Sequence, residues 1–141
     1  MRLLIDTNII LDVLLKREPF SDSAGKVLTL SGRKDVHEYV SASAITDIYY
    51  IAHRQLKDKA AVKALLKRLL LIVSVAGVSE QEIKRALDLD WTDFEDSVQY
   101  AVASLASFDG IVTRNPDDYR DSEITVWQPD SLLKALALEP K

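Results

Sequence analysis

Four aspartates stand where their carboxylates could act together: Asp6 after LLI, Asp47 in SASAITDIYYIA, Asp96 in DFEDSVQYAVAS and Asp118 in IVTRNPDDY. Two carboxylates held roughly 4 Å apart repel each other by about 4 kcal/mol at the effective dielectric of a protein surface. A divalent cation supplies the missing counter-charge, and magnesium and manganese prefer carboxylate oxygens and water as ligands. Such an ion can activate water against a phosphodiester. The four aspartates therefore predict a Mg²⁺ or Mn²⁺ site with Asp6 and Asp96 as principal ligands.

The hydropathy pattern predicts the elements that position these side chains. Short apolar runs predict five strands, and apolar residues at helical spacing predict helices between them. The strands are expected at residues 3–5, 39–42, 71–75, 111–113 and 124–126, and helices through 9–14, 24–30, 45–52, 58–69, 79–87, 92–108 and 130–136. Short apolar strands separated by helices predict one α/β domain over residues 1–141, a three-layer α/β/α fold with a mainly parallel sheet.

Ligands bind outside the carboxyl ends of the strands in such sheets. Asp6 ends the first strand and Asp47 follows the second. Asp96 follows the third strand after a helix, and Asn115 and Asp118 follow the fourth. The sequence thus predicts that these residues, although distant along the chain, meet at one edge of the sheet.

Capping residues also predict where several helices begin. Ser43 and Asp58 are expected to begin two helices, and Ser79 with Glu82 and Thr92 with Glu95 have the spacing of capping boxes. The last of these helices is expected to place Phe94, Val98, Val102, Leu105 and Phe108 on one apolar side and Asp96 on another. Because negative charge is favoured in the first turn of any helix, Asp93 and Glu95 are interpreted as residues of the helix start alone.

Composition narrows the function classes. The chain has 141 residues and no cysteine, which excludes disulfides, zinc-thiolate sites and cysteine nucleophiles. A net charge of -4 is unusual for a nucleic-acid binder, yet residues 54–68 are basic whereas residues 88–96 are acidic. His37 and His53 lack partners at metal-ligand spacing. No signal peptide or membrane span is legible, so we expect a cytoplasmic protein without a membrane partner.

The four segments resemble the successive motifs of PIN-domain proteins, in the family's order and over nearly the whole chain: LLIDTNIILDVLL, SASAITDIYYIA, DFEDSVQYAVAS and IVTRNPDDY. This resemblance implies a Mg²⁺- or Mn²⁺-dependent endoribonuclease of the VapC type. Such a protein cleaves RNA and is the toxin of a type II toxin-antitoxin pair, neutralised by a small antitoxin. It also implies that the apolar helices of the N-terminal half form a homodimer contact or an antitoxin groove.

The resemblance assigns roles to individual positions. Asp6 and Asp96 match family aspartates, and Asp118 matches the second acid of its loop, so all three are candidate metal ligands and, with Asp47, candidate catalytic residues. Thr7 and Asn8 match the polar pair that supports the first aspartate. Thr113 and Asn115 are the supporting polar residues at the end of the fourth strand, and Arg114 is placed to meet a phosphate.

Two positions depart from the family pattern. Asp47 stands where most members have glutamate, which shortens the side chain by one methylene. Asn115 stands where many members have the last aspartate, so one negative charge is missing. A catalytically weakened PIN fold that binds RNA or an antitoxin therefore stays open as an alternative.

Two other functions are disfavoured by the residues present. A receiver domain needs a phosphorylatable aspartate after the third strand, where this chain has LLIVSVAG. A haloacid-dehalogenase phosphatase needs Asp-x-Asp after the first strand, whereas this chain has Asp6-Thr7-Asn8.

Overall fold

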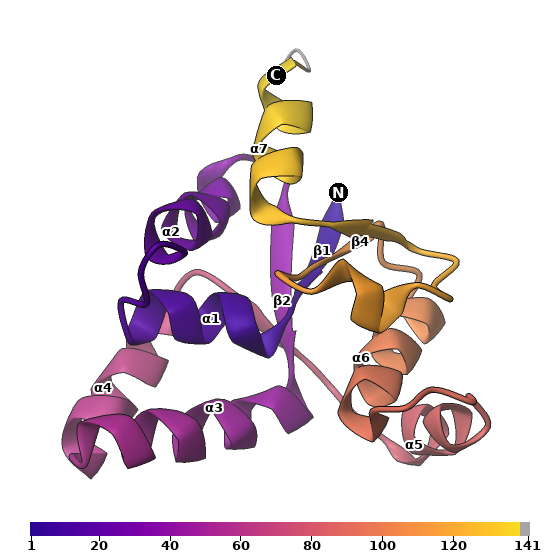
Figure 1. Ribbon diagram of the computed structural model, residues 1–141, viewed down its shortest axis with the longest axis horizontal. Helices are drawn as coiled ribbons and strands as arrows, with labels where there is room; N and C mark the ends of the chain where they lie inside the picture. Colours follow the sequence, from indigo (N-terminus) through magenta and orange to yellow (C-terminus); the bar gives the residue numbers. More distant parts are fainter. Residues whose placement is uncertain (139–141) are drawn as a thin grey trace.

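The computed structural model describes residues 1–138 and contains one five-stranded parallel sheet of order β3-β2-β1-β4-β5 (Figure 1). This confirms the predicted α/β fold; residues 139–141 of the expected domain lie outside the described part. The strands are β1 (Arg2–Ile5), β2 (His37–Ser41), β3 (Ser74–Ala76), β4 (Gly110–Val112) and β5 (Thr125–Trp127). The helices are α1 (Thr7–Leu14), α2 (Ser21–Thr29), α3 (Ala42–Leu56), α4 (Lys59–Leu69), α5 (Glu80–Leu87), α6 (Phe94–Leu105) and α7 (Pro129–Leu138), with 3-10 turns η1 (Leu30–Gly32) and η2 (Pro116–Tyr119).

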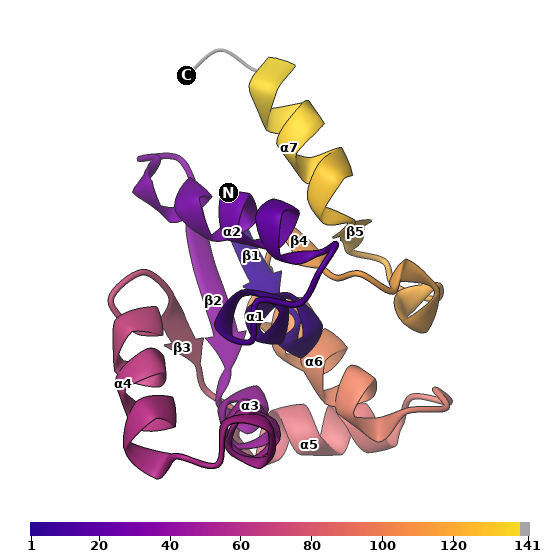
Figure 2. The same ribbon diagram turned by 60° about the vertical axis from the view of Figure 1, so that its left-hand side comes forward.

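Each face of the sheet has its own apolar core. Because successive side chains of a strand point to opposite faces, Leu3 and Ile5 of β1 pack into one core and Leu4 packs into the other. The first core receives apolar residues from α1, α2, α3, α4 and α7, and the second receives them from α5 and α6. Figures 1 and 2 show α5 and α6 on the side of the sheet opposite α1 and α2. No helix within residues 1–138 is long and apolar enough to cross a membrane.

All strands are parallel, but the order in which they follow one another along the chain changes direction between β1 and β4. From β1 the chain continues to β2 on one side of the sheet, whereas it continues from β4 to β5 on the other side. Loops therefore diverge at the carboxyl ends of β1 and β4, which is where open parallel sheets bind ligands. Asp6 follows β1 here, and its backbone N–H donates to the Val112 carbonyl of β4 at 2.9 Å. The predicted sheet-edge position of Asp6 is thus confirmed.

The expected strands are found with shifted ends. β4 begins one residue earlier than predicted, β5 ends one residue later, and β3 covers Ser74–Ala76 where the sequence predicts residues 71–75. The apolar run before β3 belongs to a turn that ends α4, because the N–H groups of Ile72 and Val73 both donate to the Leu69 carbonyl at 3.0 Å. Leu71 is 85% exposed in that turn. Hydropathy alone does not separate such a turn from an edge strand.

Two predicted helix caps are wrong. The cap of α3 is Ser41, whose hydroxyl accepts from the Ala44 N–H at 3.1 Å, because the helix begins two residues earlier than Ser43 suggests. The cap of α6 is Asp93, whose carboxylate accepts from the Asp96 N–H at 3.2 Å. The predicted capping box of Thr92 with Glu95 is therefore absent.

Of the further predictions for the helices, those for the apolar side of α6 are partly wrong, whereas two predicted caps are confirmed. Phe94 precedes the buried part of α6 and is 48% exposed, contrary to its expected place on the apolar side. Leu105 at the other end of α6 is 41% exposed. The cap at Asp58 and the capping box of Ser79 with Glu82 are confirmed.

Glu38 on β2 is a buried carboxyl inside the larger core. It is 3% exposed, and neither of its carboxyl oxygens has a hydrogen-bond partner among the described residues. Burial disfavours the charged form and raises the pKa of Glu38 to about 8. The folded protein therefore keeps Glu38 protonated at pH values where the unfolded chain, with a pKa near 4.5, has already released the proton. Stability is lost as pH rises through this window.

Replacing Glu38 with glutamine removes this titration while preserving the shape of the side chain. We expect Glu38→Gln to raise the free energy of unfolding at pH 7 by about 3 kcal/mol, since one pKa unit corresponds to about 1.4 kcal/mol. The gain should vanish near pH 4. Urea unfolding at both pH values measures it, with the exposed Glu80→Gln as the matched control. An equal effect of Glu38→Gln at the two pH values would contradict the buried titration.

Candidate active site

Asp6 is held by four hydrogen bonds in the crevice between β1 and β4. Its Oδ1 accepts from the Thr7 N–H at 2.7 Å and from Gln99 Nε2 at 3.3 Å. Its Oδ2 accepts from the Thr113 hydroxyl at 2.8 Å and from Asn8 Nδ2 at 3.5 Å. Burial raises the pKa of Asp6, whereas the donors around it oppose that rise. The side chain caps α1 and is at the same time fixed in one orientation toward α6.

Asp96 faces Asp6 from the first turn of α6, and Tyr119 lies between them. The Tyr119 hydroxyl donates to Asp96 Oδ1 at 3.4 Å and also lies within hydrogen-bonding range of Asp6. Burial, followed by the charge of Asp6, raises the pKa of Asp96 to about 7. Burial and the two carboxylates raise the pKa of Tyr119 far above its usual value, so its hydroxyl stays a donor. The two predicted principal residues are therefore brought together.

Glu95 joins the same cluster, contrary to its interpretation as a residue of the helix start alone. Its Oε1 accepts from the Thr7 hydroxyl at 3.3 Å, and its carboxyl lies within hydrogen-bonding range of Asp47. Burial first, and then the contact with Asp47 and the charge of Asp6, raise the pKa of Glu95 to about 7. Asp47 thus contacts the cluster through Glu95.

These carboxylates line a cavity of about 250 Å³. Its wall consists of Asp6, Thr7, Asn8, Leu11, Arg17, Ile51, Asp93, Glu95, Asp96 and Asp118. Asp118 is exposed on η2, and its charge contributes to the raised pKa of Asp96. A second hollow of about 490 Å³, mostly acidic, shares Asp93, Asp96 and Asp118 with the first. Of the predicted acidic residues, Asp6, Asp96 and Asp118 therefore line the cavity, whereas Asp47 does not.

The side-chain atoms in this region that could bind a metal ion are oxygens, which suits magnesium or manganese. The raised pKa values of Asp96 and Glu95 indicate that positive charge is lacking among them. Within residues 1–138, however, no three acidic or histidine side chains are arranged so that they could hold a metal ion together. The residues fit an ion bound by one or two carboxylates that keeps several of its waters, as magnesium commonly does.

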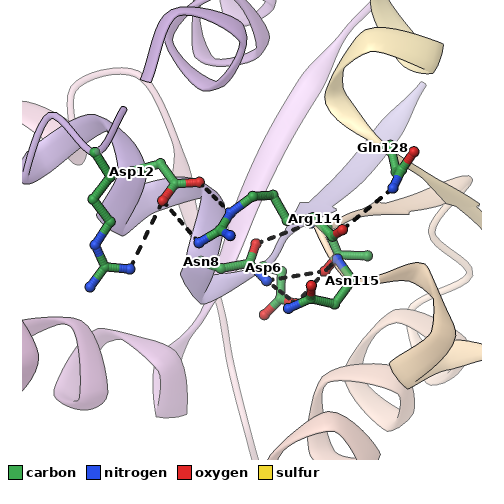
Figure 3. A network of polar contacts seen from close by, with 8 residues as sticks. Asp6, Asn8, Asp12, Arg114, Asn115 and Gln128 are labelled. Carbon is green, nitrogen blue, oxygen red and sulfur yellow. Dashed lines mark hydrogen bonds and ion pairs between the residues drawn. The ribbon is translucent and has the colours of Figure 1, made fainter. Parts of the chain in front are cut away.

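Thr113 organises the polar residues behind Asp6. Its hydroxyl donates to Asp6 and lies 3.3 Å from Asn8 Nδ2 and 3.1 Å from the Asn115 N–H, both of which donate to it. Asn8 Oδ1 accepts from the Arg114 N–H at 3.2 Å. Figure 3 shows Asn8 and Asn115 beside Asp6. The predicted supporting residues therefore form one connected network.

The side chain of Arg114 points away from this network toward Asp12 (Figure 3). Its Nε and Nη2 donate to the two carboxylate oxygens of Asp12 at 2.7 and 3.2 Å. Its guanidinium also stacks over the Phe20 ring, 3.9 Å from the centroid. Asp12 is fully buried, so this two-point ion pair ties α1 to the segment after β4. The structure thus gives Arg114 a different contact from the predicted phosphate.

Sequence reasoning missed Gln99, Tyr119, Glu95 and Arg17 as residues of the site. Gln99 had a signal, because it lies three residues after Asp96 and so shares a helix face with it. Tyr119 had a weaker signal as the neighbour of Asp118. Glu95 was not recognised because its spacing from Thr92 fits a capping box. Nothing in the sequence indicated that Arg17 lines the cavity.

Comparison with known proteins supports the fold independently. Residues 2–117 match the PIN domain family. A similar solved structure is VapBC2 from Rickettsia felis bound to a DNA fragment from its promoter, with a TM-score of 0.72 and 14% identity over 91% of this chain and 98% of that chain. VapC20 from Mycobacterium tuberculosis, a sarcin-ricin loop cleaving toxin, has a TM-score of 0.62 and 19% identity over 77% of this chain and 86% of that chain. A toxin-antitoxin complex from Klebsiella pneumoniae has a TM-score of 0.68 and 18% identity over 90% of this chain and 97% of that chain. At these identities the likeness shows the fold. Comparison with curated proteins gave no match.

The electrostatic link between the two facing carboxylates is testable. Asp6→Asn should lower the pKa of Asp96 from about 7, because it removes the negative charge that most strongly opposes ionisation of Asp96. A ¹³C NMR titration of the aspartate carboxyl carbons measures this shift. The exposed Asp22→Asn serves as the matched control and should leave the pKa of Asp96 unchanged. An unchanged pKa of Asp96 in Asp6→Asn would show that the charge of Asp6 does not contribute to it.

Proposed function

Because the chain belongs to the PIN-domain family, we propose that it is a Mg²⁺- or Mn²⁺-dependent endoribonuclease that hydrolyses RNA phosphodiester bonds. The observation that carries this proposal is the facing pair Asp6 and Asp96, whose raised pKa values mark a site that lacks positive charge. The cavity beside them opens at the carboxyl ends of β1 and β4, where this fold class binds its ligands.

Asp6 and Asp96 are the residues that would hold the ion, with Asp118 at the rim of the same cavity. When bound, a divalent ion lowers the pKa of a coordinated water and stabilises the charge that develops on the phosphodiester. Tyr119 donates to Asp96 and so restrains its carboxylate on the side of Asp6. Thr113 and Gln99 prevent Asp6 from turning away from the cavity, because each donates to one of its oxygens.

Glu95 is suited to accept the proton of the attacking water. Its carboxyl lines the cavity and accepts from the Thr7 hydroxyl, and a bound cation would favour its charged form, which is the form that accepts a proton. Asp47 raises the pKa of Glu95 through its contact with this residue, so it acts on the site indirectly. The catalytic set we propose is therefore Asp6, Asp96, Asp118 and Glu95, with Asp47 as the positioning residue of Glu95.

We further propose that the chain is the toxin of a type II toxin-antitoxin pair. Structures of similar fold include a toxin-antitoxin complex and a VapBC assembly with promoter DNA. A small antitoxin protein and a second copy of this chain are the partners that follow from this proposal. A catalytically weakened module that binds RNA or antitoxin is the second candidate, favoured by the missing charge at Asn115 and the absence of a three-carboxylate group in residues 1–138.

The two candidates differ in RNA cleavage. Wild-type protein with Mn²⁺ should cleave RNA, and Asp6→Asn and Asp96→Asn should each lower the rate by at least about 100-fold, because each removes a charged ligand. Gel analysis of labelled RNA measures the rate, and circular dichroism confirms the fold of each variant. Asp22→Asn is the control with unchanged activity. RNA binding without Mn²⁺-dependent cleavage in the wild type would favour the weakened module.

Metal binding should also release protons near neutral pH. At pH 6 the carboxyls of Asp96 and Glu95, with pKa values of about 7, are largely protonated, and a bound cation favours their charged forms. Mn²⁺ titration calorimetry in buffers of different ionisation enthalpy should detect this release at pH 6 and little of it at pH 8.5. Cleavage should correspondingly increase as pH rises through about 7. Equal proton release at both pH values would contradict the assignment.

A further inference from the structure

Among the described residues that line the carboxylate cavity of about 250 Å³, Arg17 is the only basic one, and Arg120 lines the adjoining acidic hollow. It follows α1 at a sharp reversal, where Lys16 adopts a left-handed backbone with φ 50°. Its backbone N–H donates to the Asp12 carbonyl at 3.0 Å, and its carbonyl accepts from Phe20 and Ser21 at 3.0 and 2.7 Å. The backbone of Arg17 is therefore anchored, and the side chain extends from a fixed point on the wall that Asp6 also lines.

The charge of Arg17 is only weakly compensated. Asp12 is its one ion-pair partner within residues 1–138, with a single contact of 3.9 Å between Nη1 and Oδ1. The same carboxylate is already engaged at two points by Arg114, at 2.7 and 3.2 Å. Two guanidinium groups, both charged at any physiological pH, thus share one buried carboxylate. Net positive charge is left on this side of the cavity, and it belongs to the more exposed of the two arginines.

Exposure and contacts separate the roles of the two arginines. The side chain of Arg114 is 25% exposed and is fixed by Asp12 and the Phe20 ring. That of Arg17 is 38% exposed, and among residues 1–138 its single ion-pair contact leaves most of its five N–H donors without a partner. An RNA chain that enters an acidic cavity meets repulsion from Asp93, Asp118 and their neighbours. A guanidinium on the same wall offers the fork of donors that binds phosphate.

We infer that Arg17 binds a backbone phosphate of RNA next to the scissile one, whereas Arg114 serves to hold Asp12. This inference rests on the proposed ribonuclease function. It makes Arg17 a substrate-positioning residue and assigns to Arg17 the phosphate contact that the sequence suggested for Arg114.

The test measures RNA binding without cleavage. Both the reference protein and the variants carry Asp96→Asn, and a fluorescein-labelled single-stranded RNA is titrated in Mg²⁺ at several salt concentrations, with fluorescence anisotropy as the readout. Adding Arg17→Ala should weaken binding by about 10-fold at 0.1 M salt, as expected for the loss of a charge-assisted hydrogen bond. It should also reduce the slope of log K against log salt by about 0.7, the value for one lost phosphate contact on a single strand. Arg17→Lys should retain the slope.

Controls separate this contact from a structural role. Lys26→Ala removes an exposed positive charge on α2, paired with Asp22 and outside the cavity wall, and should leave affinity and slope unchanged. Arg17→Gln provides a second variant of similar length should Arg17→Ala unfold, as judged by thermal unfolding. Unchanged affinity, or weaker affinity with an unchanged salt slope in both folded variants, would overturn the inference.

Failure of the inference is distinguishable from failure of the proposed function. Protein with the natural Asp96 is first tested for Mn²⁺-dependent RNA cleavage. If it cleaves RNA while the Arg17 variants bind RNA normally, only the role of Arg17 is rejected. If it neither cleaves nor binds RNA, the proposed function is rejected together with the phosphate contact.

Discussion

The hydrogen bond of 2.8 Å from the Thr113 hydroxyl to Asp6 is the contact on which the candidate site depends. It joins the residue after β1 to the residue after β4, at the point where the sheet reverses its direction of connection. Backbone hydrogen bonds tie both residues to the neighbouring strands: the Asp6 N–H donates to Val112 of β4 and the Thr113 N–H to Trp127 of β5, both at 2.9 Å. The backbone of Asp6 therefore continues the hydrogen-bonded sheet, and the strands hold its carboxylate in a fixed position.

The second constraint is electrostatic. Asp6, Glu95 and Asp96 are brought together with burial and without a cation among their hydrogen-bond partners, so each of the three has a raised pKa. Neutral donors stabilise the arrangement in place of a cation: Thr7, Thr113, Gln99 and Tyr119. Asp12, a buried carboxylate of the same helix, is by contrast paired with arginine and faces away from the cluster. The paired carboxylate of Asp12 and the unpaired carboxylate of Asp6 are thus separated by less than two turns of α1.

The sequence predicted the fold and the most important site residue for related reasons. Apolar runs that alternate with helical spacing determine the parallel sheet, and a polar residue directly after a buried strand must lie at its carboxyl edge. Asp6 satisfies that rule without knowledge of any contact, whereas Thr113, expected as the last residue of a strand over 111–113, directly follows β4 in the structure. Glu95 could not be recognised, because its spacing from Thr92 fits a capping box equally well, and only the packing of α6 against Thr7 decides between the two. Arg17 and Tyr119 depend on loop geometry, which short-range patterns do not specify.

The partners of Asp6 come from widely separated parts of the chain: Gln99 is 93 residues away and Thr113 is 107 residues away. A chain still being synthesised has β1 and α1 long before it has α6 or β4, and during that time Asp6 is only the cap of an N-terminal helix. The carboxylate cluster is assembled by the final third of the described chain and not before. Growing chains on the ribosome therefore pass most of their synthesis without the arrangement of charges that defines the mature protein.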